Sequence, residues 1–131
     1  MTVVFDTNVL VAALVAKGLC HEALDRALAG RLLASSTPLL DELEETLRRK
    51  FDAGPATKDF LSRLRRHVRV VAPAPLPARV CRDQDDDVVL ATAVAAQSVA
   101  VVTGDQDLLV LGAYQDIPIL TPREFLEWLD G

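Results

Sequence analysis

Carboxylates gather at the two ends of one stretch of the chain, residues 83–107, in numbers that suit metal-ion chemistry. Six aspartates mark these ends: Asp83, Asp85, Asp86, Asp87, Asp105 and Asp107. One aspartate at the start of a helix is an ordinary cap, but three in a row pack like charges together, which is unfavourable without a counter-cation. Carboxylate oxygens are typical ligands of Mg²⁺ or Mn²⁺. The stretch therefore indicates a candidate metal site.

The elements between these acids explain how the two ends meet. Residues 88–96 predict a helix, and residues 99–102 predict a buried strand because they form a short valine-rich run. A helix of about ten residues spans roughly 15 Å, about the length of a short strand. The returning strand therefore brings Asp105 to the edge where the helix begins, which is the edge at which open α/β sheets bind ligands. We expect Asp105 to converge with Asp86 and Asp87.

Two further acids stand at comparable positions. Asp6 directly follows a strand predicted over residues 2–5, and the next residues can cap the following helix equally well, so capping alone does not require it. Glu42 borders the leucine stripe of a helix predicted over residues 38–50. Two metal ions among such acids can activate a water and stabilise the leaving oxygen of a phosphodiester. The candidate catalytic set has four members: Asp6, Glu42, Asp86 and Asp105.

Strands alternate with helices along the whole chain. The predicted helices cover residues 9–16, 20–29, 38–50, 57–67, 88–96 and 122–129, and the predicted strands cover 2–5, 31–35, 69–71, 99–102 and 117–120. Gly30 is expected at the C′ position after a helix, Thr121 and Glu124 have capping-box spacing, and residues 52–55 and 108–113 are expected to form a loop and a turn. This alternation predicts an α/β fold, a three-layer α/β/α arrangement with a central, mostly parallel sheet, in a single domain over residues 1–131.

Composition narrows the class of protein. The 131 residues carry a net charge of −5, and the two cysteines have no paired spacing, which argues against a disulfide framework or a zinc site. His21 and His67 are predicted to be surface residues. No secretory signal is visible, and the longest weakly polar run is too short to span a bilayer, so we expect a soluble cytoplasmic protein with no membrane partner. Residues 48–82 hold ten Lys or Arg and two acids, which suits a polyanionic substrate but equally suits a solvated helix face.

Three motifs in a fixed order carry a family resemblance: VFDTNVL, STPLLDELEETL, and RDQDDDVVLATAVAAQSVAVVTGDQDLL. This ordered set, which spans nearly the whole chain, resembles the PIN-domain ribonucleases, in particular the small prokaryotic VapC-like toxins. In the branch that the chain most resembles, a proline often follows the first aspartate of the acid cluster. Gln84 stands there instead, a departure that affects the rigidity of the turn rather than the chemistry.

The resemblance assigns roles to individual residues. The four catalytic acids, all expected to hold metal, are the set above, and Asp87 competes closely with Asp86 for the third place. Asn8 is the polar companion of the first acid, and Thr103 precedes the fourth and can orient a carboxylate or a water. Asp83 and Asp107 are expected in the outer layer around the metal ligands. The candidate contacts to RNA phosphates are Arg48, Arg49, Arg63, Arg65 and Arg66.

The resemblance further implies Mg²⁺- or Mn²⁺-dependent endoribonuclease activity, in which a water on the metal attacks phosphorus and leaves a 3′-hydroxyl and a 5′-phosphate. It also implies the role of toxin in a toxin–antitoxin system, a cognate antitoxin that occludes the site, and homodimerisation.

Three other classes of protein share part of this pattern. A HAD-type phosphatase needs a second Asp two residues after Asp6, where Asn8 stands, and a receiver domain needs an acid pair there and a late Lys, whereas no Lys follows Lys58. The remaining alternative is a catalytically inactive PIN-like domain that binds RNA or a partner. The presence of all four acids argues against it.

Overall fold

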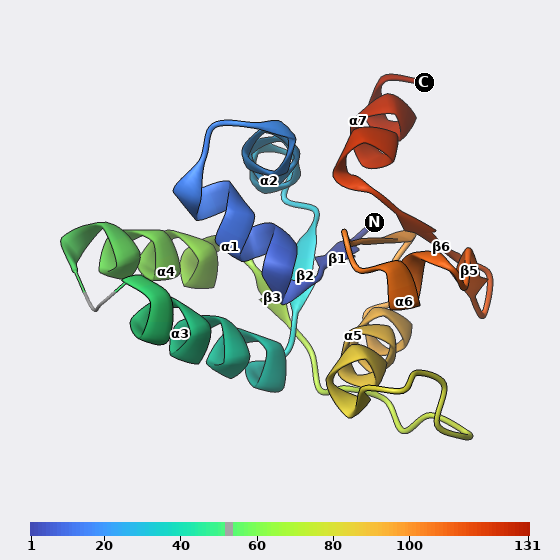
Figure 1. Ribbon diagram of the computed structural model, residues 1–131. Coiled ribbons are helices and arrows are strands. Elements are labelled where there is room, and N and C mark those ends of the chain that lie inside the picture. The colour runs from blue at the N-terminus through green and yellow to red at the C-terminus, as the bar shows by residue number, and fades with distance from the viewer. Residues whose placement is uncertain (52–53) are drawn as a thin grey trace.

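A computed structural model describes residues 1–51 and 54–131 (Figure 1). It has an α/β fold around a six-stranded sheet with the strand order β3-β2-β1-β4-β6-β5. The strands are β1 (Val3–Phe5), β2 (Leu33–Ser35), β3 (Arg69–Val70), β4 (Ala100–Val102), β5 (Ala113–Tyr114) and β6 (Ile117–Leu120). The described strands pair in parallel except for β5, which is antiparallel to β6. The predicted α/β fold with a mostly parallel sheet is therefore confirmed.

The helices of the described residues are α1 (Thr7–Val15), α2 (Leu19–Ala29), α3 (Thr37–Phe51), α4 (Pro55–His67), α5 (Gln84–Ala95), α6 (Gln106–Leu109) and α7 (Pro122–Asp130). The predicted turn over residues 108–113 is confirmed only at residues 110–111, because α6 extends to Leu109 and β5 begins at Ala113. Of the predicted loop over residues 52–55, residues 52 and 53 lie outside the described residues, and Pro55 already begins α4.

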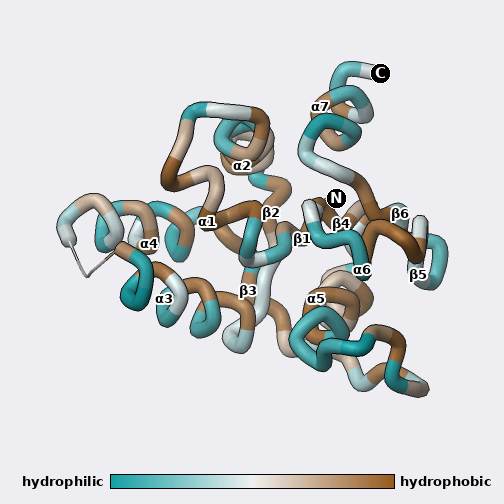
Figure 2. The backbone as a smooth tube through the Cα atoms, in the orientation of Figure 1, coloured by the Kyte–Doolittle hydropathy of each residue, from teal (hydrophilic) through white to brown (hydrophobic). Residues whose placement is uncertain are grey.

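The side chains of each strand alternate between two hydrophobic clusters, one on either face of the sheet. Val3 and Phe5 pack with α1, α2 and α7, whereas Val4 packs with α5 on the other face. Figure 1 shows α2 and α7 above the strands and α5 below them, and Figure 2 shows that the strands between these helices are mostly hydrophobic. The three-layer arrangement follows from burying both faces of a parallel sheet.

Helix α5 begins four residues earlier than the sequence predicted. Asp83 occupies its N-cap position and accepts a hydrogen bond from the backbone N–H of Asp85 at 2.9 Å. Acidic residues are favoured in the first turn of a helix because they complement its dipole. The acid run therefore lies inside the helix, with Asp85, Asp86 and Asp87 in its first turn.

The ends of two other helices test the predicted caps. Helix α7 has the predicted capping box, in which Thr121 and Glu124 exchange side-chain and backbone hydrogen bonds. The prediction for Gly30 was wrong: it is the C-cap of α2 with φ −85°, and Arg31 takes the left-handed conformation at C′ with φ 54°. The hydrogen bond from Leu32 N–H to the Ala27 carbonyl completes this turn and offsets the cost of a positive φ outside glycine.

Helix α7 supports the first strand from above. The ring of Phe125 packs edge-on against Phe5, with centroids 5.6 Å apart and planes at 85°, and Trp128 stacks on its other side. Both phenylalanines are almost completely buried. The hydrogen bond from Thr103 N–H to the Leu120 carbonyl at the end of β6 adds a second link from the C-terminal elements to the centre of the sheet.

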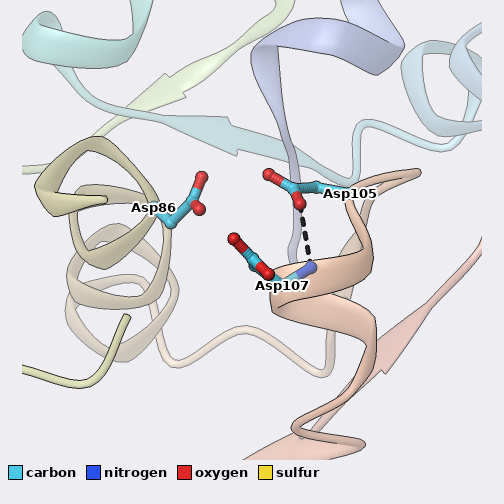
Figure 3. Close-up of side chains that lie close together, drawn as sticks. All are labelled: Asp86, Asp105 and Asp107. Atoms are coloured by element: carbon cyan, nitrogen blue, oxygen red, sulfur yellow. Dashed lines mark hydrogen bonds between the residues drawn. The ribbon is translucent and has the colours of Figure 1, made fainter. Parts of the chain in front are cut away.

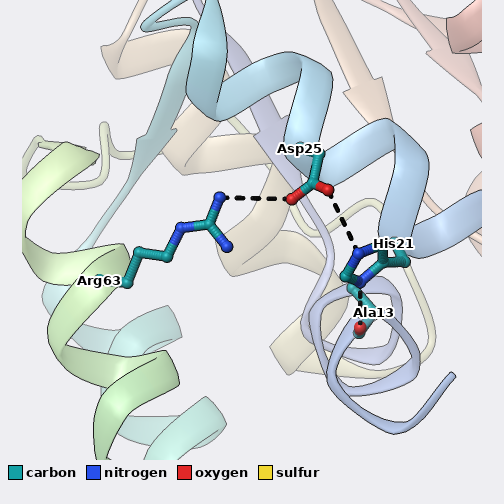
Figure 4. Close-up of polar contacts among 4 residues, drawn as sticks. All are labelled: Ala13, His21, Asp25 and Arg63. Carbon is teal, nitrogen blue, oxygen red and sulfur yellow. Dashed lines mark hydrogen bonds and ion pairs between the residues drawn. The ribbon is translucent and has the colours of Figure 1, made fainter. Parts of the chain in front are cut away.

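Polar contacts join α1, α2 and α4 on one side of the molecule (Figure 4). His21 lies 3.1 Å from the Ala13 carbonyl through Nδ1 and 3.2 Å from Asp25 through Nε2, and the guanidinium of Arg63 reaches the other oxygen of Asp25 at 3.4 Å. His67 is exposed as predicted, but His21 is half-buried and engaged at both ring nitrogens. The His21 side chain is 36% exposed and so lies at the surface as predicted, but it also makes these two contacts.

None of the helices in residues 1–51 and 54–131 is by itself long and apolar enough to cross a membrane. Helices α1 and α2, which are bent by 106° relative to each other, together have the length and composition of a membrane span, and these are the only two features that point to one.

Candidate metal centre

The ends of β1 and β4 bring two of the predicted acids to one edge of the sheet. Phe5 lies opposite Val102 in the parallel register, and the Asp6 N–H donates to the Val102 carbonyl at 2.9 Å. The Thr103 hydroxyl donates to the Asp6 carboxylate at 2.8 Å and accepts from the Asp105 N–H at 3.0 Å. One fully buried hydroxyl therefore fixes both acids, in the orienting role predicted for Thr103.

Asp105 also belongs to a group of three aspartates. Asp86, Asp105 and Asp107 each place a carboxylate oxygen within 4.8 Å of the other two. In Figure 3, Asp86 reaches across from α5 toward Asp105 and Asp107, which stand at the start of α6, and the Asp107 N–H donates to Asp105 at 2.9 Å. We call these three residues the aspartate triad. Oxygens that share a small divalent cation at about 2.1 Å lie at most about 4.2 Å apart, so small side-chain adjustments suffice for one ion to join all three.

Burial and mutual repulsion dominate the electrostatics of this edge. Asp86 is 8% exposed, and its burial, together with the charges of Asp105 and Asp6, raises its pKa to about 7. Burial also raises the pKa of Asp6, against the opposing effect of the hydrogen bond from Thr103. Both carboxyls are therefore disfavoured as anions, and a bound cation would remove that penalty.

Glu42 lies on α3, within electrostatic range of this edge. Its side chain is half-buried, and its pKa is raised by burial and by the charges of Asp85 and Asp6. It is not a member of the triad. Of the four predicted catalytic acids, Asp6, Asp86 and Asp105 thus lie together, and Glu42 lies near enough to Asp85 and Asp6 for their charges to act on it.

A family model described as "PIN domain" matches residues 2–107, which include all of these acids. The chain belongs to the PIN-domain family. PIN domains are generally nucleases, and they typically use divalent metal ions, which fits an edge built from carboxylates. A comparison with curated proteins gave no match.

The side chains of Asp86 and Asp87 have different partners in the structure. Both carboxylate oxygens of Asp87 accept hydrogen bonds, from Val80 N–H at 3.1 Å and Cys81 N–H at 2.8 Å. Burial raises the pKa of Asp87, but these hydrogen bonds outweigh it and leave the pKa below its ordinary value. Asp87 anchors the segment before α5, and Asp86 is the residue that reaches the triad. The geometry therefore does not support the metal-ligand role predicted for Asp87.

The residues predicted to surround the metal ligands lie at different distances from the triad. Asp83 caps α5, as described, and Asn8 lies exposed in the first turn of α1, where it lines a hollow together with Asp105. Asp107 was expected in the outer layer, but it belongs to the triad itself. The signal was the short α6, because a helix that begins at Gln106 must place Asp107 in its first turn, next to Asp105.

The arginines predicted to contact RNA lie on α3 and α4. Three of them form ion pairs with acids outside the triad: Arg48 and Arg65 with Glu44, at 3.4 and 3.7 Å, and Arg63 with Asp25. Arg49 and Arg66 are exposed. Sequence reasoning did not single out Arg82, whose guanidinium lies 2.8 Å from the Asp107 carboxylate. Its position directly before the first acid of the run was the available signal.

Proposed function

We propose that this PIN domain is a divalent-metal-dependent endoribonuclease that acts as the toxin of a type II toxin–antitoxin pair. The observation that carries the nuclease proposal is the aspartate triad beside Asp6. A nearly buried carboxyl with a pKa raised to about 7 stands among like charges, an arrangement that costs stability. Such sites are found where a protein binds a cation or moves protons.

The donor set fits Mg²⁺ or Mn²⁺. All the candidate ligands are carboxylate oxygens, which hard cations of this size prefer. Asp86, Asp105 and Asp107 would hold the ion, and Asp6 and Glu42 stand beside it to bind it through water or to hold a second ion. The cation supplies a water of lowered pKa and offsets the charge that develops on the phosphate oxygens.

The remaining work falls to the protein's own side chains. The Thr103 hydroxyl keeps the Asp6 carboxylate oriented. Asp86 gives up its proton as a cation binds, because the cation reverses the repulsion that raised its pKa. Glu42, half-buried and with a raised pKa, is suited to take the proton of the attacking water. The products are a 3′-hydroxyl and a 5′-phosphate.

The toxin role is supported by the ordered motifs that resemble VapC-like toxins. An antitoxin that covers the acidic edge would prevent RNA from reaching it, and homodimerisation belongs to the same proposal. The test is induced expression of the chain in a bacterial host, alone and with the product of a small neighbouring gene. Growth arrest that Asp6→Asn abolishes and the neighbouring product relieves is expected. Normal growth with active nuclease present would contradict the toxin role.

The nuclease test uses purified protein, mixed cellular RNA and Mn²⁺ or Mg²⁺, beside EDTA and Asp6→Asn controls. Cleavage that is lost in both controls is expected. Cleavage that survives Asp6→Asn would contradict the proposed site. Should no RNA be cut, Mn²⁺ titration calorimetry distinguishes the alternative: metal binding without cleavage indicates an inactive RNA- or partner-binding PIN domain.

A further inference from the structure

A second charged feature borders the aspartate triad, on the segment that precedes α5. Arg82 donates from one guanidinium nitrogen to Asp107 at 2.8 Å, yet its side chain is 87% exposed. It lines a shallow surface depression with five other residues: Arg79, Asp83, Gln84, Asp85 and Asp107. A guanidinium has five N–H donors, and among the described residues Asp107 is the partner recorded for it, so most of its donors face solvent in the depression.

Arg79 holds this segment in place. Its guanidinium donates to the backbone carbonyls of Cys81 and Arg82. The two hydrogen bonds to Asp87 described above fix the same segment from the side of α5. The backbone that carries Arg82 is therefore tied at three consecutive residues, 80–82, whereas its side chain projects outward. The backbone is therefore already fixed, and only the side chain of Arg82 has to become ordered when it binds an anion.

The negative charge of the site means that a cation here would favour binding of a nucleic-acid substrate. Acids dominate this edge, and each phosphate of an RNA strand adds a negative charge. A metal at the triad compensates the phosphate that it contacts, but the neighbouring phosphates would still meet Asp83 and Asp85 in the depression. Of the predicted alternatives, Arg48, Arg63 and Arg65 pair with Glu44 and Asp25. Arg49 and Arg66 are exposed on α3 and α4, whereas Arg82 contacts the triad itself.

We infer that Arg82 binds a backbone phosphate of single-stranded RNA next to the cleaved one, and that Arg79 positions the segment that presents it. The inference rests on the proposed function for its substrate class. Arg82 keeps its contact with Asp107 or exchanges it for the phosphate, and a planar guanidinium offers the paired donors that match phosphate oxygens. The contact is to the backbone and carries no base specificity.

The experiment measures binding of a short fluorescent single-stranded RNA by anisotropy across a salt series, in Ca²⁺, with intact RNA confirmed on gels. Arg82→Ala is expected to weaken binding about tenfold and to reduce the slope of log K against log salt by about 0.7, the value for one lost phosphate contact on a single strand. Arg82→Lys keeps the charge and is expected to retain the slope. The matched control is Arg26→Ala, which removes a similar exposed pair, Arg26 with Asp130 at 2.9 Å, on a different surface.

Mn²⁺ calorimetry without RNA separates this role from a structural one. If Arg82 only orients Asp107 for the metal, Arg82→Ala weakens Mn²⁺ binding and leaves the salt slope unchanged, which would overturn the inference. Unweakened Mn²⁺ binding with a reduced slope supports it. A wild-type protein that cuts RNA while Arg82→Ala binds RNA normally refutes the inference but not the nuclease. A protein that never cuts RNA but shows the Arg82-dependent slope refutes the nuclease but not the inference.

Discussion

Two charged regions of this PIN domain are built on opposite principles. Around Asp25, on α2, each carboxylate oxygen meets a basic side chain, His21 on one side and Arg63 on the other (Figure 4). At the aspartate triad, carboxylates meet mainly one another, and the exposed Arg82 is the cation recorded beside them among the described residues (Figure 3). The first region is partly exposed, so its pairs contribute little to stability. The second is partly buried, so its repulsion is costly.

The difference between paired and unpaired carboxylates distinguishes structural charges from candidate binding charges in this molecule. Compensated charges connect helices and can be replaced at small cost. Uncompensated charges persist in a buried place only if something outside the chain compensates them, and a divalent cation does so for carboxylates. Substitutions in the two regions should therefore change different observables, and the four expectations below run from the largest effect to the smallest.

Asp105→Asn should cause the largest loss of activity. It removes a negative ligand from the triad and changes the partner of the Asp107 N–H. We expect RNA cleavage in Mn²⁺ to fall by at least about a hundredfold, because the site can no longer hold the ion in register. Initial rates on labelled RNA measure this, with Asp25→Asn as the isosteric control in the compensated region. A rate within about threefold of wild type would contradict the assignment.

The pH dependence of stability should differ in sign from that of an ordinary carboxylate. The pKa of Asp86 is raised from 3.8 to about 7, so the folded protein holds more protons than the unfolded chain between these values. In EDTA, the free energy of unfolding should therefore fall, by on the order of 2 kcal/mol, as pH rises from about 4 to about 7, and then level off. Asp6 and Glu42, with raised pKa values, act in the same direction, whereas the lowered pKa of Asp87 acts only below pH 4.

Thermal melts from pH 5 to pH 8 measure this dependence. Asp86→Asn should flatten the curve, and Mn²⁺ should stabilise the protein more at pH 8 than at pH 5, because metal and proton compete for the same carboxylates. A melting temperature that rises steadily with pH in EDTA would contradict a raised pKa of Asp86 in the folded protein.

Thr103→Val should affect both stability and metal binding, but more modestly. It removes the hydroxyl that joins Asp6 to the Asp105 N–H and leaves that donor without its partner. We expect a loss of about 1 kcal/mol in the free energy of unfolding and about tenfold in Mn²⁺ affinity. Thr103→Ser keeps the hydroxyl and should restore most of the affinity, which urea unfolding and calorimetry measure. An affinity loss in Thr103→Ser as large as that in Thr103→Val would contradict the role of the hydroxyl.

Asp25→Ala should have the smallest effect. It removes two partly exposed ion pairs, with His21 and Arg63, each of which contributes about 0.5 kcal/mol or less. We expect a small decrease in urea-unfolding stability and unchanged RNA cleavage. Loss of cleavage in a folded variant would mean that the compensated region takes part in function.

The sequence predicted one site for Asp6 and Asp105 because strands alternate with helices and each of these acids follows a strand. Parallel strands end at the same edge of a sheet. It did not settle Asp86 against Asp87, because neighbouring helical residues point about 100° apart and their direction depends on where the helix begins. The apolar pattern begins at Val88, so the first turn of α5 was missed, and with it the engagement of Asp87 by Val80 and Cys81.

Other differences come from contacts that are distant in sequence. The partners of Arg63 and Arg65, Asp25 and Glu44, lie 38 and 21 residues away, so a local reading of the basic stretch could not show that these charges are compensated. Strand β5 has two residues, too few for any alternation to be visible. The triad role of Asp107 depended on a four-residue helix that the composition of residues 106–109 only weakly suggests.

The edge-on contact between Phe125 and Phe5 has a consequence for the order in which the protein is made. Every acid of the candidate metal centre precedes β6 and α7 in the chain. The strand that precedes Asp6 is supported by Phe125, and the Thr103 N–H donates to the Leu120 carbonyl. During translation, all the acids therefore leave the ribosome before the elements that hold them in place. A chain made in this order lacks the full support of its acidic edge until residues 117–131 have been synthesised.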